Sequence, residues 1–251
     1  MTALPPHELR RLERVAGDDP AVLARLVERR TAGEPLQYLE GTSAFGPFDL
    51  IVDPRVLIPR PETEQMWELV ASLADRPAVV VDLCTGSGAL AIACTSTWPD
   101  ARVVAADLSP QAAQVARINA ARCGTAVEVL EGDLFEPLPE ELRGSVDVLV
   151  SNPPYVTDAE WDDLPGDVKC EPRMALVSGT RGTEILERIA AGAGEWLSGS
   201  GVTVCEIGET QGDVMIQVFA RFFTSVEVRR DLTGRDRFVV ASGLRVPGVA
   251  T

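Results

Sequence analysis

Apolar residues recur along this chain in two periods, one typical of helices and one typical of strands. Near the amino end, Leu, Val and Ala return at helical spacing over His7–Ala16 and Ala21–Ala32, which predicts two short helices. From residue 78 onward, short apolar runs alternate with longer amphipathic stretches. The predicted strands are Ala78–Leu83, Arg102–Ala106, Val127–Leu130, Val146–Val150, Val202–Ile207, Val226–Arg230 and Arg237–Ala241. The predicted helices among them are Ala89–Thr97, Pro110–Cys123, Glu184–Leu197 and Asp213–Phe222.

This alternation predicts an α/β fold, with a mostly parallel sheet of seven strands and helices on both of its faces. A short segment with Thr233-Gly234 joins the last two strands, so we expect one antiparallel strand at the edge of the sheet. Residues 45–56 read as extended with a turn at Gly46-Pro47, and a helix follows to about Leu73. The chain then divides into a short helical segment (1–40), a β-hairpin with a linker helix (41–75) and an α/β domain that would carry the active site (76–251).

Charge and composition exclude several classes of protein. A net charge of −15 disfavours direct binding to nucleic acid, because such binding needs a surface rich in Lys and Arg. The five cysteines include no CxxC pair and are expected to be reduced, mostly buried thiols, and the single histidine is His7, so we expect neither a bound metal nor an imidazole base. No apolar run approaches the ~20 residues that cross a bilayer. We expect a cytoplasmic monomer without a membrane partner.

The fourth strand of the predicted sheet ends in Asn152-Pro153-Pro154-Tyr155. Proline carries no N–H, so these residues offer carbonyl acceptors with few competing donors, and the Asn152 side chain adds one more oxygen. Such a cluster suits both hydrogens of a planar NH2 group, with the Tyr155 ring lying against its plane. Taken by itself, however, a Pro-Pro pair after a strand is more often a turn.

A second motif follows the first strand. Gly86 and Gly88 stand in Cys84-Thr85-Gly86-Ser87-Gly88 at the start of a helix, and Asp107 ends the second strand 21 residues after Gly86. Glycines let a ligand lie against the backbone, and an acid at this place binds ribose hydroxyls, so the pattern suits NAD or S-adenosylmethionine. After the third strand, Asp133 and Leu134 suit the adenine amino group and ring face, although a solvated turn explains them equally well.

With these motifs in place, the chain resembles the HemK/PrmC family of protein glutamine methyltransferases. The resemblance covers residues 33 to 241 and includes Pro59-Arg60-Pro61-Glu62-Thr63-Glu64, Glu171-Pro172 and Thr233-Gly234-Arg235-Asp236-Arg237 in addition to the motifs above. It implies a class I, Rossmann-like methyltransferase fold. It also implies an enzyme that uses S-adenosylmethionine to methylate the glutamine of the Gly-Gly-Gln motif in peptide-chain release factors. The segment before Gly33 is shorter than the helical bundle of that family.

The resemblance also implies roles for single residues. Cys84 to Gly88 would wrap the methionine part of the cofactor, Asp107 would hold the ribose, Leu134 would border adenine, and Asn152 to Tyr155 would hold the glutamine. Cys84 stands where the family usually has glycine, and Leu134 where some members have an aromatic residue. The implied partner is a release factor.

Catalysis without histidine would depend on orienting the substrate nitrogen. The Asn152 side-chain oxygen and the Pro153 carbonyl would accept its two N–H bonds and aim the nitrogen at the sulfonium methyl group. Within the family a ribosomal protein glutamine is the alternative substrate, and Asn-Pro-Pro-Tyr also occurs in enzymes that methylate the exocyclic amine of adenine in DNA or RNA. An NAD-dependent oxidoreductase and a non-catalytic scaffold are the rival classes. A role for Glu62 or Glu64 stays open.

Overall fold

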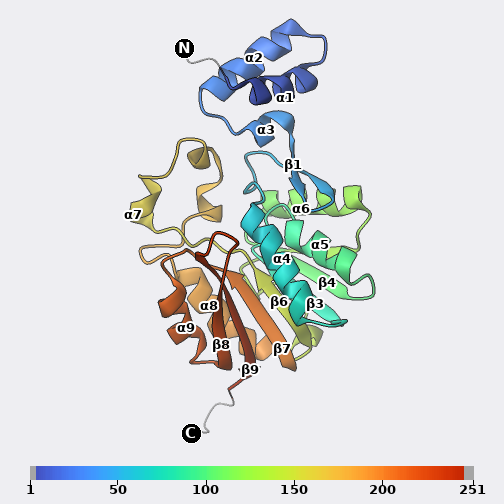
Figure 1. The fold of residues 1–251 in the computed structure, drawn as a ribbon. Coiled ribbons are helices and arrows are strands. Elements are labelled where there is room, and N and C mark those ends of the chain that lie inside the picture. The colour runs from blue at the N-terminus through green and yellow to red at the C-terminus, as the bar shows by residue number, and fades with distance from the viewer. Residues whose placement is uncertain (1–3, 246–251) are drawn as a thin grey trace.

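The computed structural model describes residues 4–245 and has a seven-stranded mixed sheet at its centre (Figure 1). The strand order is β5-β4-β3-β6-β7-β9-β8. The strands are β3 (Val79–Leu83), β4 (Arg102–Asp107), β5 (Val127–Glu131), β6 (Val146–Ser151), β7 (Leu197–Glu206), β8 (Phe223–Arg230) and β9 (Asp236–Leu244). The first five of these pair in parallel, and β9 is antiparallel to both β7 and β8. The predicted α/β fold is confirmed, although the antiparallel strand β9 lies one position in from the edge, which β8 forms.

Helices cover both faces of the sheet, as the strand and helix alternation predicts. The helices of this part are α4 (Pro61–Leu73), α5 (Ala89–Thr97), α6 (Pro110–Cys123), α8 (Glu184–Trp196) and α9 (Gly212–Phe219). Successive residues of a strand point to opposite faces, so Val80 packs in the core under α4, α5 and α6, while Val81 packs in the core under α8 and α9. In Figure 1 the two helical layers lie on either side of the strands.

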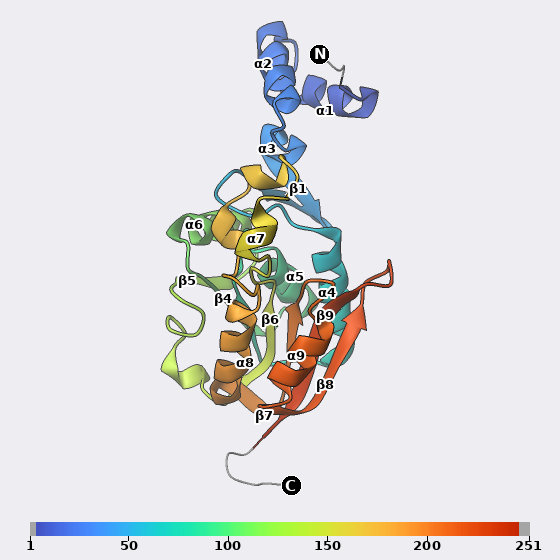
Figure 2. The ribbon, with the colours of Figure 1, turned by 90° about the vertical axis from the view of Figure 1, so that its left-hand side faces the viewer.

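Three helices form a separate cluster at the amino end: α1 (Pro6–Ala16), α2 (Pro20–Thr31) and α3 (Leu36–Glu40). Leu12, Leu26, Leu36 and Leu39 are buried against one another, so this cluster has a small core of its own. Figures 1 and 2 show that the three helices lie beyond one end of the central sheet, on the side where β1 (Thr42–Phe45) follows α3. The helix α3 is absent from the sequence prediction, because five residues between Pro35 and Gly41 are too few to show a helical period.

A short hairpin connects this cluster to the sheet. Its strands β1 (Thr42–Phe45) and β2 (Phe48–Ile51) pair around Gly46-Pro47, as predicted. The buried Asn119 of α6 ties the hairpin to the main domain: its side chain accepts the Ile51 N–H at 2.7 Å and donates to the carbonyls of Ile51 and Ser87 at 3.0 and 2.9 Å. The hairpin is therefore fixed beside the loop after β3.

The strand β7 begins immediately after α8, five residues earlier than the sequence predicts. Ser198-Gly199-Ser200-Gly201 has the composition of a turn, and these residues fall where the pairing with β6 is irregular, between the pairs Val146–Leu197 and Val148–Val202. A further short helix, α7 (Asp158–Trp161), lies in the long connection between β6 and α8, together with 3₁₀ turns at Val168–Cys170 and Arg173–Ala175; another 3₁₀ turn is Glu140–Leu142. The predicted division at residues 40 and 75 stays a prediction, and its ends include residues 1–3 and 246–251, which lie outside the described residues.

The cysteines are free thiols, but their burial differs. Cys94 and Cys205 are buried, Cys84 and Cys123 are partly buried, and Cys170 is exposed, so the expectation of buried thiols is wrong for Cys170. Cys170 lies in a 3₁₀ turn of the long connection before α8, where apolar burial is not available. No helix within residues 4–245 is long and apolar enough to cross a membrane.

Candidate active site

A cavity of about 360 Å³ opens at the carboxyl ends of the central strands. The strand order reverses at β3: β4 lies on one side of it and β6 on the other. Ligands of open α/β sheets bind at such a reversal, outside the carboxyl ends of the strands, and the cavity lies there. It brings together most of the predicted site residues: Cys84, Thr85, Gly86, Ser87, Asp107, Asp133, Leu134, Asn152 and Pro154. Gly88, Pro153 and Tyr155 do not line it.

The loop after β3 turns sharply at two residues with left-handed backbone, Cys84 (φ 58°) and Gly86 (φ 56°). A left-handed conformation favours glycine, so the non-glycine residue Cys84 carries backbone strain here. The Gly86 N–H donates to Asp107 Oδ2 at 2.8 Å, and the Thr85 N–H donates to the Ala106 carbonyl at 3.1 Å. The loop is thus held against the end of β4.

Asp82 is a site residue that the sequence prediction missed. Its side chain is 1% exposed and lines the cavity, and its Oδ2 accepts the Thr85 hydroxyl at 2.6 Å and the Ala91 N–H at 3.2 Å. The other oxygen, Oδ1, is buried without a partner within residues 4–245. Burial raises the pKa of Asp82 to about 7. An unpaired buried carboxylate oxygen is costly, and a cationic amino group in the cavity would satisfy it.

Asp107 closes the loop from the β4 side. Its Oδ1 accepts the Ser109 N–H at 2.9 Å, while Oδ2 holds Gly86, and burial raises the pKa of the carboxyl group. Each carboxylate oxygen has a further lone pair, so Asp107 can still accept hydroxyl groups. The neighbouring Leu108 also lines the cavity and is 58% exposed, an apolar wall that the sequence prediction missed.

The two predicted site residues after β5 differ in what they contact. Leu134 is buried with a left-handed backbone (φ 51°) and lines the cavity. Asp133 also lines it, but its Oδ2 pairs with Arg188 of α8 at 2.8 Å. Asp133 therefore keeps one oxygen for a ligand.

Asn152 faces the cavity in a fixed orientation. Its Nδ2 donates to Thr63 Oγ1 of α4 at 3.0 Å. Tyr155 behaves differently from the prediction: its ring packs in the core under α8 and α9, and its hydroxyl donates to Glu206 Oε1 at 3.1 Å. The ring is therefore not placed to lie against a group in the cavity, because the chain turns away after Pro154 and the Tyr155 N–H donates to the Leu176 carbonyl at 3.1 Å.

The segment before α4 is anchored by a buried glutamate. Glu171 is 4% exposed, accepts the Ile58 N–H at 2.9 Å and forms an ion pair with Arg60. From α4 itself, Thr63 lines the cavity, whereas Glu62 and Glu64 do not. The long connection before α8 supplies the opposite wall through residues 172–175. Its irregular backbone gave no periodic signal by which the sequence could have placed it there.

Comparisons with known proteins agree with this geometry. A model of the family described as "Methyltransferase small domain" matches residues 67–166. The release factor glutamine methyltransferase of Mycolicibacterium smegmatis is 47% identical over 240 residues, which cover 92% of this chain and 84% of that protein. The enzyme of the same name from Corynebacterium glutamicum is 40% identical over 237 residues, with the same shares covered. This chain belongs to the release factor glutamine methyltransferase family.

Membership of the release factor glutamine methyltransferase family confirms the resemblance that the sequence showed and the methyltransferase activity that it implied. It rules out the oxidoreductase and scaffold alternatives. The solved structure of ribosomal protein L11 methylase from Lactobacillus delbrueckii subsp. bulgaricus superposes with a TM-score of 0.55 at 23% identity, covering 76% of this chain and 83% of that one. That likeness confirms the class I methyltransferase fold.

Within the family fold, Gly88 has a packing role in addition to any contact with a ligand. It has a left-handed backbone (φ 84°), and a Cβ there would lie 3.2 Å from Ala116 Cβ and 3.3 Å from Ala116 Cα of α6. Gly88→Ala is expected to lower the free energy of unfolding by about 1–3 kcal/mol, through backbone strain and overpacking. Urea denaturation measures this loss.

Gly144→Ala is the matched control for Gly88→Ala. Gly144 also has a left-handed backbone (φ 67°), but a Cβ there meets no atom within 4 Å. The control should therefore show the backbone strain alone, about 1 kcal/mol. Equal losses in the two variants would contradict a packing role for Gly88.

Proposed function

We propose that this protein transfers a methyl group from S-adenosylmethionine to the side-chain nitrogen of the glutamine in the Gly-Gly-Gln motif of a peptide-chain release factor, in the cytoplasm. The observation that carries the proposal is that one cavity is lined both by the loop at Cys84 to Ser87 with Asp107 and by Asn152. The names of the similar proteins, release factor glutamine methyltransferase, support the substrate.

The cofactor half of the cavity has the donors and acceptors that this ligand needs. The unpaired Oδ1 of Asp82 suits an α-amino group, Asp107 suits ribose hydroxyls, and Leu108 and Leu134 give apolar walls for a base. The free Asp133 oxygen suits an exocyclic amine. When bound, S-adenosylmethionine supplies an electrophilic methyl group on a sulfonium.

The residues at the other half would orient the substrate nitrogen. Because Asn152 Nδ2 is bound to Thr63, the carbonyl oxygen of the amide is left as an acceptor on the cavity side. The second N–H falls, in this proposal, to the Pro153 carbonyl, which has no hydrogen-bond donor within residues 4–245 and follows Asn152 in the chain, although Pro153 does not itself line the cavity. An amide nitrogen is a weak nucleophile, so holding it in line contributes much of the rate, up to about 7–11 kcal/mol for well-oriented groups. The same two oxygens would stabilise positive charge as it develops on nitrogen. The methylated nitrogen would then lose one proton to solvent, which leaves a neutral N-methyl amide and S-adenosylhomocysteine.

Labelled S-adenosylmethionine tests the proposal directly. Incubation with a purified release factor should transfer one labelled methyl group per molecule, and changing the Gly-Gly-Gln glutamine of the release factor to alanine should remove the labelling. Parallel incubations with ribosomal proteins and with DNA and RNA cover the other acceptors. Labelling of any of these in place of the release factor would overturn the proposed substrate.

A further inference from the structure

A buried glutamate lies behind the acceptor half of the cavity without lining it. Glu206 ends β7 and is 1% exposed. Its Oε2 accepts the Thr63 hydroxyl at 2.9 Å, and its Oε1 accepts the Tyr155 hydroxyl at 3.1 Å. Burying a carboxylate is costly unless its oxygens are hydrogen-bonded, and both oxygens of Glu206 are. The methyl transfer described above makes no use of this group.

The hydrogen bonds of Thr63 run in one direction. An ionised carboxylate only accepts, so when Glu206 is charged the single hydroxyl hydrogen of Thr63 points to it. The lone pairs of Thr63 Oγ1 must then face Asn152, whose Nδ2 donates to them at 3.0 Å. An asparagine amide has similar shape in its two orientations, and without such a partner it can turn its NH2 group to the side where an acceptor is needed. The chain from Glu206 through Thr63 selects one orientation.

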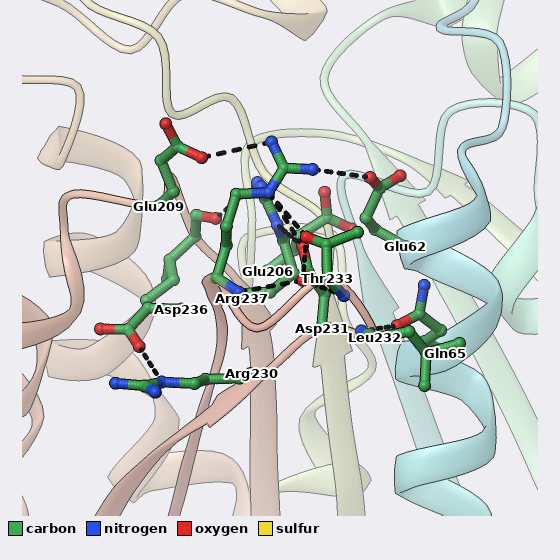
Figure 3. A network of polar contacts seen from close by, with 12 residues as sticks. Glu62, Gln65, Glu206, Glu209, Arg230, Asp231, Leu232, Thr233, Asp236 and Arg237 are labelled. Carbon is green, nitrogen blue, oxygen red and sulfur yellow. Dashed lines mark hydrogen bonds and ion pairs between the residues drawn. The ribbon is translucent and has the colours of Figure 1, made fainter.

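A buried cation favours the charged form of Glu206. Arg237 of β9 is 8% exposed, and its Nη1 donates to the Ile207 carbonyl at 3.1 Å. Figure 3 shows Glu206 next to Arg237, with Asp231 and Thr233 of the hairpin between β8 and β9 close by. Burial raises the pKa of Glu206 to about 7, and the Thr63 hydrogen bond and the Arg237 charge lower it from what burial alone would give.

We infer that Thr63 and Glu206 are positioning residues, which hold the Asn152 amide with its oxygen toward the substrate NH2 group. The inference rests on the proposed function, because a substrate NH2 is what makes an acceptor at this place necessary. It adds to that function a chain of contacts from α4 and β7, whose members lie 89 and 143 residues apart in sequence. If the Asn152 amide turned by 180°, its NH2 group would face the NH2 group of the substrate. Two donors would then face each other, and the substrate nitrogen would not be held in line with the methyl group.

Thr63→Val and Thr63→Ser test the hydroxyl. Valine keeps the shape and removes the hydrogen bonds, so kcat for the release factor is expected to fall roughly 10- to 100-fold, as for a misoriented reacting group. The KM for the release factor and the Kd for S-adenosylmethionine should change little, and Thr63→Ser should restore most of kcat. Thr95→Val is the matched control: Thr95 is a buried helical threonine whose hydroxyl donates to the Ala91 carbonyl, and its loss should leave kcat unchanged.

Glu206→Leu separates the positioning role from a direct contact of Thr63 with the substrate. Glu206 does not line the cavity, and leucine removes the acceptor of the Thr63 hydroxyl, so the hydroxyl hydrogen no longer has to point away from Asn152. We expect a fall in kcat like that of Thr63→Val, and no further fall in the variant that combines the two changes. An unchanged kcat in Glu206→Leu, or losses that multiply in the double variant, would overturn the inference.

Proton exchange of the Asn152 side chain gives a readout that needs no substrate. In ¹⁵N NMR spectra the Asn152 NH2 signals are those missing from Asn152→Asp, and in Thr63→Val they should exchange roughly 3- to 10-fold faster than in Thr63→Ser. Equal exchange rates would show that Thr63 does not hold the amide. A wild-type protein that methylates no release factor would contradict the proposed function, and the exchange rates would still decide the positioning role.

Discussion

Replacing Asn152 with alanine is expected to lower kcat for release factor methylation roughly 100- to 1,000-fold, the range found when one oriented polar contact to a developing charge is removed. The variant loses the oxygen that faces the cavity, while the loop from Cys84 to Ser87 and Asp107 keep their hydrogen bonds to one another. The Kd for S-adenosylmethionine should therefore stay within a few-fold of the wild-type value. Single-turnover kinetics and isothermal titration calorimetry measure the two quantities separately.

Gln217→Ala is a suitable control for Asn152→Ala, because Gln217 is an exposed amide on α9 and does not line the cavity. It should match the wild-type protein in kcat and in cofactor affinity. If Asn152→Ala kept kcat within a few-fold of wild type, Asn152 would not orient the substrate. A large loss of cofactor affinity in Asn152→Ala would instead indicate that the residue mainly shapes the cofactor half of the cavity.

Periodicity was sufficient to predict the layers of this fold, because most strands and helices here bury a continuous face. The Val-rich run at 79–83 and the amphipathic stretch at 110–123 have that property, and both lie within a residue of the predicted bounds. The prediction of where β7 begins failed at Ser198 to Gly201, which have the composition of a turn and lie at an irregularity in the pairing with β6. The sequence also could not show that β9 lies between β7 and β8. The order of these two last strands depends on which of them pairs with β7, and no local pattern encodes that contact.

The candidate site was predictable where a motif ends a strand. Gly86, Asp107 and Asn152 converge because the carboxyl ends of parallel strands share one edge. What the sequence could not give is the contact between α4 and β7 that joins Thr63 to Glu206, since neither residue stands out in its own segment. The motif likewise suggested that Tyr155 faces the ligand, whereas its hydroxyl turns to Glu206. Sequence spacing places residues near a site but does not set the direction of their side chains.

Replacing Asp107 with alanine is expected to weaken S-adenosylmethionine binding by about 100-fold, which corresponds to the loss of two hydrogen bonds to a charged acceptor. The variant loses the acceptor for ribose hydroxyls, and it also frees the N–H groups of Gly86 and Ser109 that shape the loop. The Kd of Asp107→Asn should lie between those of the wild-type protein and Asp107→Ala. The N–H groups of Gly86 and Ser109 bind different oxygens of Asp107, and asparagine keeps only one of these two oxygens. Isothermal titration calorimetry with S-adenosylmethionine measures the change in Kd.

Asp147 provides a control for Asp107, because it lies at the amino ends of the parallel strands, opposite the carboxyl ends where the cavity opens. Asp147 Oδ2 accepts the N–H groups of Ala78 and Val79 at 2.7 and 3.2 Å, so Asp147→Ala also removes a carboxylate that holds two backbone donors, but it lies at the start of β6, away from the cavity. It should lower the melting temperature without a change in Kd. If both variants weakened binding equally, the effect of Asp107→Ala would come from general loss of stability, and the ribose contact would have to be abandoned. If Asp107→Ala weakened binding of S-adenosylmethionine and Asp147→Ala did not, while Asn152→Ala lowered only kcat, one half of the cavity would bind the cofactor and the other would orient the substrate.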